Sequence, residues 1–234
     1  MSVALAPQLD AADVVAQTWV REATRLHERY ILEIVEQFGL CPWATRARLG
    51  GRLRVEVSLQ ADDDSLEPSL DALDRWALDD GAEVGFLLFP RLTIARVEFD
   101  RFTAQVRAAN TKRHALGAAP FAMVAFHPEA SPSLEDAERL IPFLRRTPDP
   151  CIQVIRITVL DRVRGTVPEG TQFVDVNLLE AAASGAGAEL SVRDRVCRAN
   201  LETARRVGVD ELRRCMDEIH RDRDATYRRL GGGR

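Results

Sequence analysis

Hydrophobic residues recur along the chain with two different periods, and this predicts helices alternating with strands. From residue 10 to residue 38 they return at spacings of four and seven, which is typical of one face of a helix. Residues 52–59 alternate apolar and polar positions, as a half-buried strand does. Residues 83–90 and 121–128 are apolar almost throughout, which indicates strands covered by helices on both faces.

Further helices are predicted between and after these strands. A helix is expected over residues 67–81, where Pro68 lies in the first turn, and another near residues 98–110. Two more are expected near the end of the chain, at about 190–207 and 209–229. Residues 147–163 fit a strand because of their β-branched residues, or a helix because of their apolar spacing, and we favour the helix.

The order of these elements favours an α/β fold, with α+β as the alternative. We expect a two-layer sandwich in which a small, mostly parallel β-α-β-α-β sheet is flanked by helices, with a long N-terminal helix and a C-terminal helical pair. Residues 10–208 are expected to form a single globular domain. Residues 1–9 are expected to be a flexible N-terminus, and 209–234 a helical extension with a disordered tail.

Composition narrows the classes of function. The formal net charge is −4, so there is no basic excess and we expect no nucleic-acid partner. No apolar run is long enough for a membrane helix and the start lacks the basic part of a signal peptide, so we expect a cytoplasmic protein with no membrane partner. The four cysteines contain no C-x-x-C pair, so we expect free thiols and no metal site.

Cys41 is the first candidate for chemistry. Gly39 is placed to end the first helix, and Pro42 suits the first position of the next, so Cys41 falls at an N-cap. The free N–H groups of a helix start favour an anion, and Arg46 and Arg48 follow within two turns. Such an environment can lower the thiol pKa below its usual value of about 8.5, which would make Cys41 reactive. The alternative is a small buried hydrophobic residue.

His127 is the second candidate, because it ends the third predicted strand immediately before a proline. Ligands bind outside the carboxyl ends of strands in open α/β sheets, so a functional side chain is expected there. The alternative is a histidine that only hydrogen-bonds a loop carbonyl. A catalytic pair of Cys41 and His127 is a hypothesis, with Asn200, Glu129 or an arginine as third partner.

Five segments of the chain follow the order of a bacterial protein family. They are LCPWA (40–44), FLLFP (86–90), VAFHP (124–128), RTPDPCIQVIR (146–156) and RANLETARRVG (198–208). Through these segments the chain resembles a divergent member of domain-of-unknown-function family 1415. That family has no established reaction, so the resemblance implies a shared organisation and pocket, not an activity.

The resemblance also implies which positions matter. The matching positions are Cys41, Pro42, Ala44, Pro90, His127, Pro128, Arg146, Pro148, Pro150, Arg156 and Asn200. Three positions depart from the family pattern, since Phe89 and Gln153 stand where histidines are expected and Ile157 where a glutamate is expected. These departures remove about half of any shared metal-binding or acid–base set, which argues against a metal in this chain.

Three interpretations of the candidate residues stay open. In the first, the protein is an enzyme acting on a small anionic substrate, with Cys41 as nucleophile, His127 as acid or base, and Arg146, Arg156 and Asn200 as substrate-binding residues. In the second, it is a non-catalytic ligand-binding or regulatory module that senses haem or a small anion through the Cys-Pro turn. In a third interpretation, Cys41 and His127 serve only packing and turns. The sequence names no cofactor and no oligomeric state.

Overall fold

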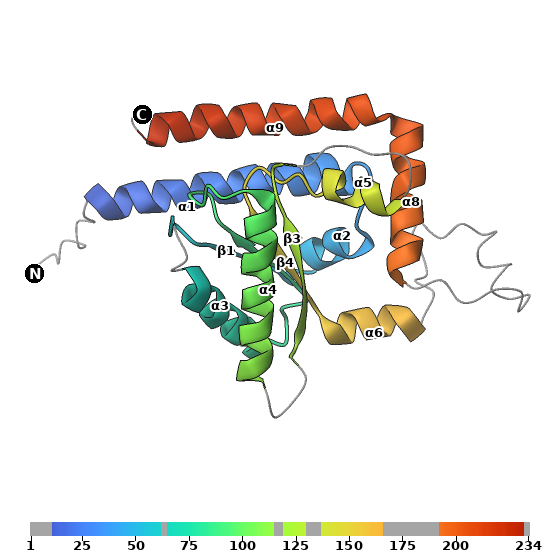
Figure 1. Ribbon diagram of the computed structural model, residues 1–234, viewed down its shortest axis with the longest axis horizontal. Coiled ribbons are helices and arrows are strands. Elements are labelled where there is room, and N and C mark those ends of the chain that lie inside the picture. The colour runs from blue at the N-terminus through green and yellow to red at the C-terminus, as the bar shows by residue number, and fades with distance from the viewer. Residues whose placement is uncertain (1–10, 62–64, 115–118, 130–136, 166–191, 232–234) are drawn as a thin grey trace, which may run out of the picture.

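The computed structural model describes residues 11–61, 65–114, 119–129, 137–165 and 192–231, within which helices surround a four-stranded sheet (Figure 1). The strands are β1 (Leu53–Val57), β2 (Val84–Leu88), β3 (Phe121–Phe126) and β4 (Cys151–Arg156). The helices are α1 (Ala11–Tyr30), the π-helix η1 (Ile31–Glu36), α2 (Pro42–Leu49), α3 (Leu66–Leu78), α4 (Arg96–Arg113), α5 (Ala137–Leu144), α6 (Ile157–Gly165), α8 (Val192–Val207) and α9 (Val209–Leu230). The N-terminus and the tail that we expected to be flexible, residues 1–9 and 232–234, lie outside the described residues.

The sheet is mixed, which corrects the expectation of a mostly parallel sheet. Its strands lie in the order β1-β2-β4-β3, with β1 and β2 parallel and β4 antiparallel to both of its neighbours. Leu88 of β2 and Phe126 of β3 both lie opposite Cys151, so β4 begins at the end of the sheet where β2 and β3 finish. The chain returns from β3 to β4 at this end of the sheet, so β4 runs in the opposite direction to β3. It lies between β2 and β3.

Residues 147–163 contain a strand and then a helix, so the preference for a helix alone was wrong. Strand β4 takes residues 151–156 and α6 follows directly at Ile157. In β4, Cys151, Ile152 and Val154 are fully buried between neighbouring strands. β-branched residues pack well in such a central position, and this non-local pairing outweighs the local helical spacing.

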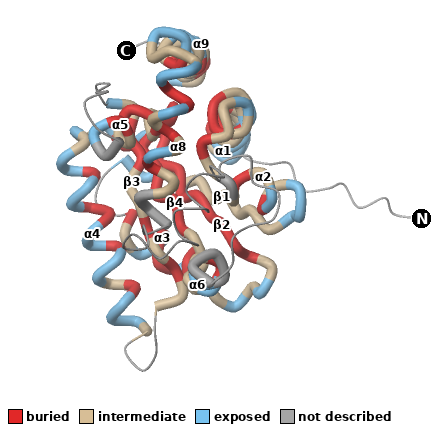
Figure 2. Tube along the Cα trace, turned by 90° about the vertical axis from the view of Figure 1, so that its right-hand side faces the viewer, coloured by how far each residue is buried: buried red, intermediate tan, exposed pale blue. Residues whose placement is uncertain are grey.

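Helices cover both faces of the sheet, so the fold has three layers and not the two that we expected (Figures 1 and 2). On one face, Phe86 and Leu88 pack with residues of α1, η1, α2, α5, α8 and α9. On the other face, Leu87 and Phe89 pack with residues of α3 and α4. Since the central strands are apolar on both faces, each face needs its own layer of helices.

The long helix predicted over residues 10–38 is confirmed, with a change of winding near its end. Helix α1 continues into η1, where hydrogen bonds span five residues instead of four. The Gln37 N–H, for example, donates to the Leu32 carbonyl at 3.1 Å. Gly39, with φ of 63°, ends the run as its sequence position predicts.

Helix α9 lies along α1, and ionic groups join the two helices (Figure 1). Asp222 accepts hydrogen bonds from Arg25 at 2.8 Å and from Arg29 at 2.6 Å. These hydrogen bonds, first that of Arg25, lower the pKa of Asp222 to about 2. The apolar side of α9 joins the core on the α1 face through Leu212, Met216 and Ile219.

Candidate functional site

A cavity of about 720 Å³ lies on the face of the sheet that α1, η1 and α8 cover and reaches around the edge strand β3 to α4, which contributes Asp100, Thr103, Ala104 and Arg107 to its lining. Phe86, Gln153 and Val124 form part of its floor, and the sheet register places them side by side on β2, β4 and β3. The helices and the segments beside them contribute Tyr30, Ile31, Val35, Leu40, Cys41, Trp43, Ile141, Leu144, Arg145, Leu160, Val196, Cys197 and Asn200. The volume lies within the range of small-molecule sites, about 300–1,000 Å³.

The junction between η1 and α2 forms one part of the cavity wall. Ile31 and Val35 of η1 line the cavity together with Leu40 and Cys41, which follow the turn at Gly39. Helix η1 has π-helical winding and ends in a Schellman turn at Gly39, where the Val35 carbonyl accepts the Leu40 N–H. Such windings are rare and often occur at functional sites, and the apolar spacing of the sequence does not reveal them.

Cys41 lies at the N-cap of α2, as the sequence predicts, but the helix start does not lower the pKa of its thiol. Burial raises the pKa of Cys41 above its ordinary value. The N–H groups of Trp43 and Ala44 and the charge of Arg145 act in the opposite direction without compensating for it. The cost of taking a thiolate out of water exceeds the effect of the helix start, so the thiol stays protonated at neutral pH.

His127 does not line the cavity; it is buried at the end of β3. Its Nε2 hydrogen-bonds the Ile94 carbonyl at 3.1 Å, and its Nδ1 accepts the Glu129 N–H at 3.2 Å. Burial lowers the pKa of the ring, which favours the neutral form that these bonds require. The ring holds the loop after β3, the alternative role considered for it, and the structure does not bring His127 to Cys41 in the cavity.

The two arginines predicted to bind substrate also lie outside the cavity lining. Arg146 donates to the Pro128 carbonyl at 3.0 Å and pairs with Asp217 at 3.2 Å. Arg156 donates to three backbone carbonyls between α3 and β2, at 2.7 and 2.8 Å. These bonds join segments of the protein to one another, and the substrate-binding role of the two arginines stays a prediction.

Two amide side chains line the cavity, Asn200 from α8 and Gln153 from the middle of β4. Their exposed fractions are 6% and 8%. Within the part of the chain that the structure describes, neither amide forms a hydrogen bond. The polar atoms of the two amides are not fully enclosed by the protein, so they are open to the cavity and available to a ligand. Asn200 was among the predicted site residues, whereas Gln153 was missed, although it is the one polar residue in the run CIQVI.

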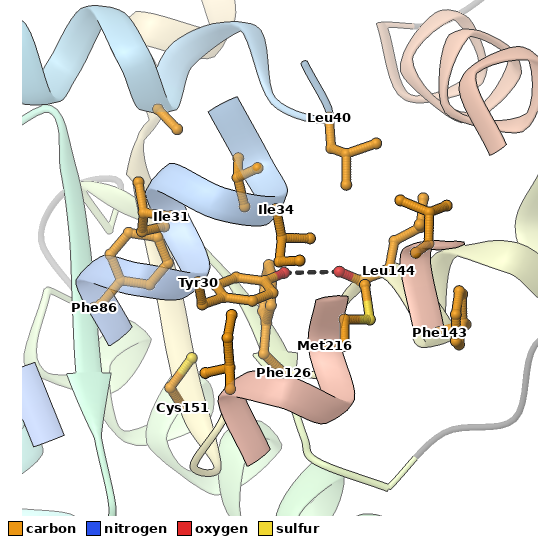
Figure 3. Close-up of a cluster of buried hydrophobic side chains, with 14 of the residues drawn as sticks. Tyr30, Ile31, Ile34, Leu40, Phe86, Phe126, Phe143, Leu144, Cys151 and Met216 are labelled. Carbon is orange, nitrogen blue, oxygen red and sulfur yellow. Dashed lines mark hydrogen bonds between the residues drawn. The ribbon is translucent and has the colours of Figure 1, made fainter. Parts of the chain in front are cut away.

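Aromatic rings form much of the remaining lining. These residues are Tyr30, Trp43, Phe86 and Phe126. The Tyr30 hydroxyl donates to the Leu144 carbonyl at 2.7 Å, which ties α1 to the end of α5 (Figure 3). The guanidinium of Arg145 lies over the Phe126 ring, 5.3 Å from its centroid. The cavity therefore combines flat apolar surfaces with a few polar groups.

Comparison with known protein families supports this organisation. The model of a family described as a protein of unknown function (DUF1415) matches residues 22–191. The chain belongs to the DUF1415 family. The DUF1415 match includes the whole sheet and Cys41, whereas α8, with Asn200, follows it. Comparisons with curated proteins and with solved structures found no match. No helix in the described ranges is both long and apolar enough to cross a membrane.

The three positions where the resemblance implied a histidine or a glutamate lie in different places. Gln153 lines the cavity, whereas Phe89 lies on the opposite face of the sheet, with the rings of Phe99 and Phe102 at 5.7 and 5.5 Å. Ile157 begins α6 and is not a lining residue. Among the described residues, no group of three or more His, Cys, Asp or Glu side chains is arranged to hold a metal ion.

Proposed function

We propose that this DUF1415 protein binds a small molecule in the cavity and does not convert it chemically. The observation that carries the proposal is a cavity of about 720 Å³ lined by two amide side chains that form no hydrogen bond with the described residues. Sites for small molecules combine a concave apolar surface with a small number of convergent polar groups, and this lining has both. The apolar body of the ligand would contact the rings and aliphatic side chains, and its polar end the amides.

Catalysis by Cys41 has weaker support. A nucleophilic cysteine needs a thiolate and a base within hydrogen-bond reach. Burial keeps Cys41 protonated, and the lining residues in the described ranges include no histidine. Ligation of haem by Cys41 would also require loss of the thiol proton. Haemin remains a useful probe, because this alternative predicts a Soret shift that Cys41→Ala abolishes.

Protection of Cys41 from alkylation tests the proposal. Iodoacetamide labelling of the four cysteines is followed by mass spectrometry, with and without the fluorescent probe 1-anilinonaphthalene-8-sulfonate (ANS). Cys41 lines the cavity, whereas Cys215 on α9 does not and serves as the internal control. With ANS at ten times its Kd, we expect labelling of Cys41 to slow by about tenfold. Labelling of Cys215 is expected to stay unchanged.

A variant that fills the cavity, compared with the same substitution outside it, provides a second test. Val196→Trp places an indole among the lining residues, and Val97→Trp changes an exposed position on α4 outside the lining. Only Val196→Trp is expected to abolish ANS binding. Equal binding by both variants, or unprotected labelling of Cys41, would contradict the proposal. Rapid labelling of Cys41 well below pH 8 would instead favour the enzyme.

A further inference from the structure

The two buried amides offer a donor and an acceptor on the same group. Gln153 presents them from the sheet and Asn200 from α8, so two different layers of the fold contribute. A side-chain amide forms paired hydrogen bonds with a partner that carries a donor beside an acceptor. A lone hydroxyl or carbonyl would leave half of each amide unpaired. The lining therefore favours a ligand edge with both functions.

The surface beside Gln153 favours a flat ligand. The register places Gln153 between Phe86 and Val124, and further rings, Tyr30, Trp43 and Phe126, line the same cavity. Aromatic rings stabilise one another in offset-stacked or edge-to-face contacts, beyond the area that they bury. A planar ring makes such contacts while its edge meets an amide, which a branched aliphatic chain cannot do.

The charged side chains of the lining already make contacts with other residues of the protein. Arg107 donates to the Met123 carbonyl at 3.0 Å, and the Arg145 guanidinium lies over the Phe126 ring. Asp100 adds a negative charge to the lining. In contrast, the two amides and the Thr103 hydroxyl form no hydrogen bond with the described residues, and all three groups are neutral. This difference favours recognition of a neutral edge over recognition of an anion.

We infer that the ligand is a planar nitrogen heterocycle with a ring N–H beside a carbonyl, as in a lactam or a nucleobase, and that Gln153 and Asn200 bind this edge. The inference rests on the proposed binding function and names the chemical class of its ligand. Gln153 and Asn200 are then specificity-determining residues, and the aromatic lining supplies affinity for any flat ring.

A pair of probes of nearly equal size tests this assignment. 2-Quinolinone carries the N–H and carbonyl side by side, and naphthalene carries neither. Both are titrated into the full chain, with displacement of ANS as the readout. We expect 2-quinolinone to bind about 10- to 100-fold more tightly than naphthalene, because the hydrocarbon leaves the amides unpaired.

Leucine variants of the amides identify the groups responsible. Gln153→Leu and Asn200→Leu are each expected to reduce the preference to less than about threefold and to retain the affinity for naphthalene. Gln105→Leu, at an exposed position on α4 outside the lining, is the control and is expected to keep the full preference. If either amide variant fails to fold, the other still tests the assignment.

Two results would overturn the inference. One is equal affinity of the wild-type chain for both probes, and the other is a preference that survives in both amide variants. In either case, ANS that still protects Cys41 would leave the proposed binding function standing. Loss of that protection would remove the proposed function as well, so the two failures are distinguishable.

Discussion

On the face of the sheet that meets α3 and α4, aromatic side chains fill the space between the layers. The Phe89 ring contacts those of Phe99 and Phe102 at centroid distances of 5.7 and 5.5 Å. A Cβ atom on Gly85 would lie only 2.4 Å from the ring of Trp76, so even one methyl group has no room there. The face that meets α1, η1 and α8 borders instead a cavity of about 720 Å³, which reaches α4 only around the edge strand β3.

This difference in packing indicates that one face of the sheet stabilises the fold and that the other face binds a ligand. Protein interiors are normally packed as densely as organic crystals, and voids in them lower the free energy of unfolding. A large open volume lined by unpaired amides is therefore unfavourable for stability alone. Natural proteins keep such features where function needs them, and this comparison supports the choice of the cavity as the candidate site.

The largest expected effect is a loss in the free energy of unfolding when one aromatic ring is truncated, and this loss is expected to differ between the two faces. Phe89→Ala leaves a void in a filled layer and is expected to lower the free energy of unfolding by about 3–5 kcal/mol. Phe126→Ala is expected to cost about 1–2 kcal/mol less, because its ring borders the cavity and has fewer contacts to lose. Urea unfolding measures both values. Equal losses would show that the two faces are packed alike.

A fall in pH is expected to lower the stability of the protein through His27, which lies on the cavity face of the sheet. This histidine is buried against the Phe86 ring at 4.4 Å, and its Nε2 has no partner among the described residues. Burial lowers its pKa from 6.5 to about 3. The unfolded chain therefore takes up a proton first as the pH falls, and the stability present above pH 6.5 is lost toward pH 3.

The variant His27→Leu tests this titration. The wild-type chain is expected to lose about 3 kcal/mol through His27 between pH 7 and pH 4, and the variant to be spared that loss. Denaturant unfolding at the two pH values measures the difference, and the values at pH 7, where the wild-type ring is neutral, serve as the control. An identical acid loss in both proteins would contradict the assignment.

Replacement of the cavity amide should have the smallest effect on stability and the opposite sign. Gln153→Leu replaces an amide that forms no hydrogen bond with the described residues by an apolar side chain in the cavity floor. We expect the free energy of unfolding of the ligand-free protein to rise by about 1 kcal/mol. Thermal unfolding checks this, with Gln105→Leu as the neutral control. A clear loss of stability would mean that the amide already has a structural partner.

The site was only partly predictable from the sequence. Cys41 and Asn200 were singled out and both line the cavity, but His127, Arg146 and Arg156 do not. A polar residue at the end of a strand is as suitable for holding a loop as for binding a ligand, and only its neighbours in space distinguish the two. The pKa of Cys41 shows the same limit, since a helix start is visible in the sequence and burial is not.

By itself the sequence determined the long N-terminal helix, the first three strands and the apolar character of the sheet on both faces, because these depend on residue order over a few turns. Only the tertiary structure decided that β4 lies antiparallel between β2 and β3. That pairing places Gln153 beside Phe86, from a segment far away in the chain, and so creates the cavity floor. Such contacts depend on chain direction and long-range packing, which local periodicity does not encode.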